Sequence, residues 1–160
     1  MPLLERLREF LQAKQADYTH SIHKTAYTAH EVASAEHLPP AEVAKTVVVH
    51  TDVGYVMLVI PSNKLVDFQE VRREPGFKLL RMATEHELSK LFPDCELGAM
   101  PPVGPLYTLP VYLDESLADE LLMAFNGGTH PDVIHMKTAE FQRLVHPVVV
   151  PLTRAEAAHG

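Results

Sequence analysis

Hydrophobic positions recur at two different spacings along the chain. Between residues 3 and 16 apolar side chains come every three or four positions, which predicts an amphipathic helix. Apolar, β-branched runs fill 46–51 and 55–60 on either side of a turn at 52–54, which predicts a β-hairpin. Strand-like and helix-like segments are mixed without the regular spacing of βαβ units. The pattern therefore predicts an α+β domain, with a mixed, mostly antiparallel β-sheet surrounded by short helices.

Turn and capping residues place the remaining elements. Thr28 followed by Glu31, and Thr84 followed by Glu87, are capping boxes that each predict the start of a helix. Further helical segments are predicted over 40–45, 65–73 and 138–145, and further strands over 78–82, 107–113, 121–125, 133–136 and 148–150. We expect a single domain over 1–155, followed by a short polar tail at 156–160.

The composition is typical of one globular domain. The 160 residues are 46% hydrophobic and 22% charged, which is enough for one core without disulfides or a structural metal. No window reaches the ~18 consecutive apolar residues of a membrane span, and charges at Glu5 and Arg6 come too early for a secretory signal. We therefore expect a cytoplasmic protein with no membrane partner. The net charge of −7 argues against binding of duplex DNA, so any nucleic acid must be held locally, as in a pocket for one terminal nucleotide.

Motifs for several common chemistries are absent from the sequence. The position four after His30 is Ser34, so the ten histidines do not form the usual zinc-binding pair on a helix. There is no G-x-S-x-G motif, no Walker motif and no G-x-G-x-x-G motif. The single cysteine, Cys95, lies between two acidic residues that would raise its pKa. We predict no metal and no cofactor.

Lys45 stands at the start of the apolar run 46–49. A lysine gains nothing from burial there, so its cation is either solvated or placed to hold a phosphate or carboxylate. The alternative is a gatekeeper lysine that discourages edge pairing of a β-prone segment.

Two loops could offer polar groups or bare main chain to a ligand. The segment 98–105 combines glycines with prolines, so the amides of its glycines and of Ala99, Met100 and Val103 could line a pocket, or the loop could be a rigid connector. The segment 126–132 brings His130 beside a hydroxyl and a carboxylate. His130 could orient a substrate carbonyl, hydroxyl or water, or merely cap its own loop.

Taken in order, four stretches of the chain resemble the YbaK and prolyl-tRNA-synthetase-associated editing domain family, in its freestanding form. These stretches are 26–33, 43–49, 98–104 and the glycine turn before Asp132, and the third contains the family's G-x-x-x-P loop as Gly98 and Pro102. The resemblance extends over about residues 20 to 150, and its specificity comes from order and spacing together.

The resemblance implies a metal-independent aminoacyl-tRNA deacylase that acts in trans on mischarged tRNA. It implies that Lys45 holds the phosphate of the terminal nucleotide, that Gly98 and Pro102 position the ester and the attacking water, and that His130 contributes to the pocket. It also implies a set of substrate-binding residues, namely Tyr27, Thr28, Thr46, Ser62, Ala99, Met100, Pro101, Gly128 and Asp132.

The sequence of the glycine turn bears on the substrate. Gly128-Thr129-His130 differs from the cysteine-type members, which carry basic residues in that region, and looks more like the alanine-editing relatives. The resemblance thus favours alanyl-tRNA for proline, or another small amino acid. The implied partners are the acceptor end of a mischarged tRNA and prolyl-tRNA synthetase. The alternatives are a noncatalytic module that binds tRNA or a synthetase and a small metal-dependent hydrolase that uses the histidines.

Overall fold

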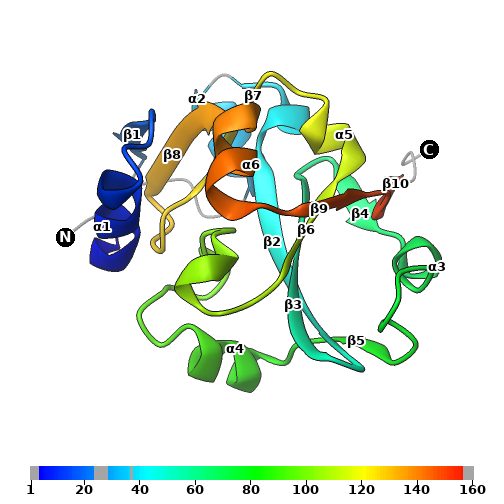
Figure 1. The fold of residues 1–160 in the computed structure, drawn as a ribbon. Helices are drawn as coiled ribbons and strands as arrows, with labels where there is room; N and C mark the ends of the chain where they lie inside the picture. The colour runs from blue at the N-terminus through cyan, green and yellow to red at the C-terminus, as the bar shows by residue number, and fades with distance from the viewer. Residues whose placement is uncertain (1–3, 24–28, 37, 157–160) are drawn as a thin grey trace.

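The computed structural model describes residues 4–23, 29–36 and 38–156 (Figure 1). The helices are α1 (Glu5–Ala13), α2 (Ala29–Glu36), α3 (Phe68–Val71), α4 (Glu85–Leu91), α5 (Glu115–Ala118) and α6 (Thr138–Val145), with 3₁₀ turns η1 (Pro40–Glu42) and η2 (Gly104–Leu106). The strands are β1 (Thr19–Ile22), β2 (Ala44–Thr51), β3 (Gly54–Pro61), β4 (Lys64–Val66), β5 (Leu80–Met82), β6 (Val111–Asp114), β7 (Leu122–Asn126), β8 (Asp132–Lys137), β9 (Val148–Val150) and β10 (Thr153–Ala155).

The largest sheet has five strands in the order β5-β2-β3-β6-β9. β2 pairs antiparallel with both β3 and β5, whereas β6 is parallel to β3 and β9 is parallel to β6. Figure 1 shows β2 and β3 running through the middle of the molecule, with short helices around them. Over all the described sheets antiparallel pairings outnumber parallel ones, so the predicted α+β fold with mixed and mostly antiparallel strands is confirmed.

Both faces of this sheet are covered, so β2 contributes to two cores. Ala44 and Val48 lie in the larger core, whereas Val49 lies in the smaller core on the opposite face. Successive side chains of a strand point to opposite faces. Lys45 and Thr46 therefore emerge on different sides of β2, Lys45 with Val49 and Thr46 with Val48.

A three-stranded antiparallel sheet, in the order β1-β8-β7, is joined to the start of β2 by a bridge between Val43 and Ala124. One of its faces contributes Phe125 to the larger core, and α2 covers the other face through Val32. The turn between β7 and β8 carries His130. Because this turn lies at the end of a buried hairpin, the sheet fixes where the turn begins and ends.

Several predicted elements lie at their expected positions. The hairpin predicted over 46–51 and 55–60 is β2 and β3, and the helix predicted over 138–145 is α6. Both bonds of the capping box between Thr84 and Glu87 are formed at the start of α4. The other proposed capping residue, Thr28, lies outside the described residues. Among the described residues, no helix combines the length and apolar character needed to cross a bilayer.

Other predicted boundaries are wrong, in each case because strand pairing overrides the local pattern. The helical turn predicted over 40–45 ends at Glu42, and Lys45 is the second residue of β2 rather than the end of a helix. The helix predicted over 65–73 begins only at Phe68, after the capping residue Asp67, because Lys64–Val66 pairs with β10.

The remaining differences concern short elements. The strand predicted over 107–113 begins only at Val111, because Thr108 has a φ of +57°, which lies outside the strand region. The sequence pattern did not predict β1, α5 or β10. Residues 157–160 of the predicted tail lie outside the described residues.

Candidate active site

The loop after Glu96 and the turn between β7 and β8 are joined by main-chain hydrogen bonds. The amide of Glu96 donates to the Gly128 carbonyl at 2.8 Å, and the amide of Gly128 donates to the Ala99 carbonyl at 2.9 Å. The Glu96 carboxylate also accepts a hydrogen bond from the His130 amide at 2.9 Å. These bonds connect segments about thirty residues apart, so the loop and the turn form one unit. We call residues 96–100 together with 127–130 the loop–turn frame.

His130 makes a further link inside the loop–turn frame. Its Nε2 lies 2.8 Å from the Leu97 carbonyl oxygen. A carbonyl can only accept, so Nε2 carries the proton in this bond. The ring also lies against Gly98, where a Cβ atom would stand 3.4 Å from His130 Cε1. The histidine therefore shapes the loop through its ring.

Two glycines of the frame are required by their backbone. Gly98 has a φ of +87° and Gly128 a φ of +98°, values that residues with a Cβ atom rarely adopt. At Gly128 a Cβ atom would also come within 2.9 Å of Leu4 Cβ, at the start of α1. The close approach of α1 explains why this turn needs glycine, and the amide of Leu4 binds the Gly127 carbonyl at 3.1 Å.

β2 is tied to the other end of the loop. Thr46 donates its hydroxyl proton to the Met100 carbonyl at 3.0 Å. Ala99 and Met100 are buried, and so are the side chains of Pro101 and Pro102. The loop therefore reaches the candidate site mainly through its main chain, while its side chains pack against the core.

Lys45 emerges on the other face of β2. It is paired with Ile60 of β3, which belongs to the smaller core, and its side chain is partly buried. Burial lowers the pKa of Lys45 from its ordinary value, while the nearby Glu156 carboxylate acts in the opposite direction. The lysine thus lies on the face of β2 that carries the smaller core, and the loop–turn frame is tied to β2 through the opposite face.

One family model, that of the aminoacyl-tRNA editing domain, matches residues 23–144, which is more than half of the chain. The chain belongs to this family. The match includes Lys45 and the whole loop–turn frame.

Solved structures share the fold of this editing domain over nearly its whole length. A crystal structure described as a proposed trans-editing enzyme for prolyl-tRNA synthetase is 25% identical, with a TM-score of 0.80 over 94% of this chain and 96% of that one. A hypothetical protein is 20% identical, with a TM-score of 0.83 over 94% and 100%. A scaffold used for epitope grafting is 23% identical, with a TM-score of 0.81 over 94% and 96%. No curated protein matches the chain.

Two other predicted site residues of the editing domain have internal partners. Ser62 is fully buried and donates to the Pro40 carbonyl at 2.8 Å, while its amide binds the Val43 carbonyl at 2.8 Å. It therefore fixes the start of β2 against η1. Asp132 is also fully buried, and its carboxylate accepts hydrogen bonds from His20 and Thr129. Tyr27 and Thr28 lie outside the described residues.

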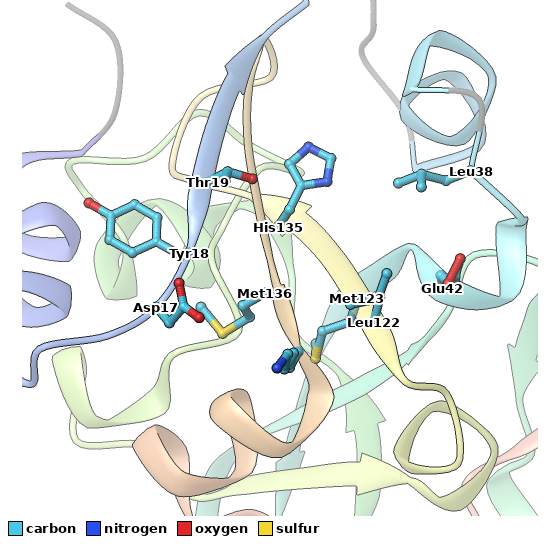
Figure 2. Close-up of a pocket in the computed structure, with 10 residues that line it drawn as sticks. Asp17, Tyr18, Thr19, Leu38, Glu42, Leu122, Met123, His135 and Met136 are labelled. Atoms are coloured by element: carbon cyan, nitrogen blue, oxygen red, sulfur yellow. The ribbon is translucent and has the colours of Figure 1, made fainter.

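A separate pocket of about 280 Å³ lies at the end of the three-stranded sheet (Figure 2). Figure 2 shows Leu38 and Glu42 facing the strands that carry Thr19, Leu122 and His135. A second pocket, of about 340 Å³, lies between α4 and the loop and includes Met100 in its lining. The first pocket contains no predicted site residue, whereas the second borders the loop–turn frame.

The remaining candidate groups can be assessed from their surroundings. Burial raises the pKa of the Cys95 thiol to about 11, so the thiol is protonated at neutral pH and is a poor nucleophile. Among the residues that the structure describes, no three metal-binding side chains gather at a common point.

Sequence reasoning missed several residues that hold the site together. Glu96 and Leu97 bind the turn, and Asn126 binds the His130 carbonyl at 2.8 Å through its side-chain amide. Asn126 could have been found, because an Asn-Gly pair is a turn signal in which the side chain often bonds nearby main chain. Glu96 and Leu97 carry no such signal, since their partner lies more than thirty positions away.

Proposed function

We propose that this editing domain is a deacylase that acts in trans, hydrolysing the ester between tRNA and a wrongly attached amino acid. The preferred substrate is alanyl-tRNA for proline. Family membership and the likeness to a structure described as a proposed trans-editing enzyme support editing. The Thr129-His130 sequence of the turn supports the preference for alanine.

The observation that carries this proposal is the direction of the loop carbonyls. Those of Leu97, Ala99 and Met100 accept hydrogen bonds from His130, Gly128 and Thr46 respectively. A carbonyl oxygen facing the ester would repel the oxyanion that develops during hydrolysis, whereas an N–H group would stabilise it. Because these carbonyls are engaged inside the protein, the loop is suited to present its amides.

Only some amides of the loop are available to bind the oxyanion. Pro101 and Pro102 have no N–H group, and the Ala99 amide is bound to the Glu96 carbonyl at 3.0 Å. We assign the donors for the developing oxyanion to the amides of Gly98 and Met100. The positive φ of Gly98 is part of this arrangement, because it sets the orientation of the peptide on each side.

Hydrolysis of the ester needs little more than its placement against these amides. The oxygen of a water molecule forms a bond to the ester carbon, and the bond from that carbon to the ribose oxygen breaks. The proton of the water goes to the ribose oxygen, giving free amino acid and a tRNA with a free terminal hydroxyl. An aminoacyl ester is already activated, so positioning supplies much of the rate, and the neighbouring ribose hydroxyl can assist.

Lys45 is proposed to anchor the phosphate of the terminal nucleotide. The proposal is supported by its place on the face of β2 that carries the smaller core, where a partly buried cation interacts with the Glu156 carboxylate. A phosphate would take the place of that carboxylate as the partner of the ammonium group. Lys45 then binds substrate without acting as base or nucleophile.

The test is deacylation of a panel of tRNAs charged with alanine, serine, threonine or cysteine. We expect faster loss of the amino acid than in buffer, with alanyl-tRNA for proline lost fastest, and a large decrease with Lys45→Ala. Lys90→Ala, which removes an exposed lysine from α4, is the matched control and should behave as wild type. Binding of tRNA without loss of any amino acid would contradict hydrolysis and favour the noncatalytic module.

A further inference from the structure

The carboxylate of Asp132 is the centre of a buried polar group next to the loop–turn frame. The side chain is fully buried, and His20 Nε2 lies 2.6 Å from its Oδ1. Its Oδ2 accepts a hydrogen bond from the Thr129 hydroxyl. A buried carboxylate is costly unless it is paired and hydrogen-bonded. His20 and Thr129 thus provide what Asp132 requires.

The main chain of Asp132 closes the turn that carries His130. The Asp132 carbonyl accepts a hydrogen bond from the Gly127 amide at 2.9 Å and another from the Asn126 side chain at 3.4 Å. The same Asn126 amide group donates to the His130 carbonyl at 2.8 Å. A change in the position of Asp132 is therefore transmitted to His130 and Gly127 through short, direct contacts.

β1 supports the same turn from outside. Its residues pair with β8, including Ile22 opposite Asp132, and the His23 amide donates to the Pro131 carbonyl at 2.7 Å. His20 is the residue of β1 whose side chain reaches Asp132. The ring of His20 is about one quarter exposed, whereas the carboxylate it binds is fully buried. The contact therefore connects a surface strand to the buried base of the turn.

We propose that His20 and Asp132 are positioning residues for the loop–turn frame. His20 donates its Nε2 proton to Asp132, and Asp132, with Thr129, holds the turn so that His130 can fix the Leu97 carbonyl. Neither residue touches the substrate in this account, which differs from the substrate contact that the sequence predicts for Asp132. As a statement about catalysis, the inference rests on the proposed deacylase function.

The test uses three variants of the full chain. His20→Ala removes the donor, and His20→Gln places an amide N–H near the position of Nε2. His135→Ala is the matched control, because it removes from the same sheet a histidine whose ring bonds Ser21 at 3.0 Å. We expect His20→Ala to lower kcat for deacylation by about 10-fold or more with KM unchanged, since a displaced reacting geometry costs up to ~100-fold. His20→Gln should recover most of that loss.

Asp132→Asn separates positioning from substrate contact. It keeps the shape of the side chain but weakens the bond with His20, so a positioning role predicts a fall in kcat at constant KM. A rise in KM at constant kcat would overturn the proposal, because that result belongs to a residue that binds substrate. Equal losses in His20→Ala, His20→Gln and His135→Ala would also overturn it, because they would indicate general destabilisation.

A readout without substrate distinguishes this inference from the proposed function. Amide NMR signals of Gly127, Gly128 and His130 should shift in His20→Ala, shift much less in His20→Gln and stay in place in His135→Ala. This pattern supports the link from His20 to the turn even if no mischarged tRNA is hydrolysed. Unchanged turn signals in His20→Ala would overturn the link even if the wild-type protein is an active deacylase.

Discussion

The two faces of β2 hold different parts of the candidate site. Thr46, on one face, is tied to a loop whose conformation is set by main-chain hydrogen bonds, glycine dihedral angles and the ring of His130. Lys45, on the other face, contributes a single cation beside Glu156. We propose that the first part orients the reacting ester and that the second holds the charged substrate. We therefore expect mutations of the first part to act on kcat and mutations of the second to act on binding.

The largest effect is expected at Gly98. Gly98→Ala places a Cβ atom at a φ of +87° and 3.4 Å from the His130 ring, so we expect deacylation to fall by about 100-fold. The control is Gly54→Ala, at a φ of +111° with nothing within 4 Å of the added atom. Both variants should lose ~1–3 kcal/mol of stability from backbone strain, but only Gly98→Ala should lose activity. If Gly98→Ala deacylates as fast as Gly54→Ala in single-turnover assays, the loop does not take part in catalysis.

The next largest effect is expected at Lys45, and it should depend on salt. Lys45→Ala removes one phosphate contact, so KM should rise by about 10-fold at low salt. The slope of log affinity against log salt concentration should become shallower by about 0.7, the value for one contact with a single strand. Lys45→Arg should retain the slope, because it retains the charge. A fall in kcat at unchanged KM would show instead that both faces of β2 serve the chemical step.

A smaller effect is expected at Thr46. Thr46→Val removes the hydroxyl that holds the Met100 carbonyl, while Thr46→Ser keeps it. The loss of one hydrogen bond is worth ~0.5–1.5 kcal/mol, so Thr46→Val should lower kcat several-fold and Thr46→Ser should stay near wild type. Chemical denaturation measures the change in the free energy of unfolding, and single-turnover kinetics measures the change in the rate of deacylation. A loss confined to KM would assign Thr46 to the substrate-binding part of the site.

The smallest effect on activity is expected far from both faces of β2, at Glu140 of α6. Its carboxylate accepts hydrogen bonds from Arg143 and from the Asp17 amide, and these lower its pKa from the ordinary 4.5 to about 2. A lowered pKa contributes stability above pH ~4.5 that is lost as the pH falls toward 2. Glu140→Gln should flatten thermal stability against pH in that window and leave deacylation at neutral pH unchanged. An unchanged pH profile would show that the contact contributes nothing.

The sequence predicts the parts of this molecule that depend on local pattern. The β2–β3 hairpin follows from two apolar, β-branched runs on either side of a glycine turn, and α4 from the capping box at Thr84 and Glu87. Short elements such as β4 and β10 could not be predicted, because three residues become a strand only when a distant segment pairs with them.

The same distinction applies to the candidate site. Gly98 and Lys45 stand out in the sequence because a glycine shortly before a pair of prolines, and a lysine at the start of an apolar run, are unusual locally. The faces of the sheet on which Lys45 and Thr46 lie could be assigned only from the register in which β2 pairs with β3. The contacts of His20 with Asp132 and of Glu96 with His130 join segments far apart in the chain, so no local sequence pattern predicts them.

In the proposed function, the loop–turn frame serves hydrolysis of a wrongly charged tRNA. The most direct measurement is the time course of ester loss from alanyl-tRNA for proline, with prolyl-tRNA for proline assayed in parallel under the same conditions. We expect rapid loss of alanine, retention of the correctly attached proline, and loss of this activity in Gly98→Ala but not in Gly54→Ala. Alanyl-tRNA that decays no faster with the wild-type protein than in buffer, together with an equally inert panel of other mischarged tRNAs, would contradict it.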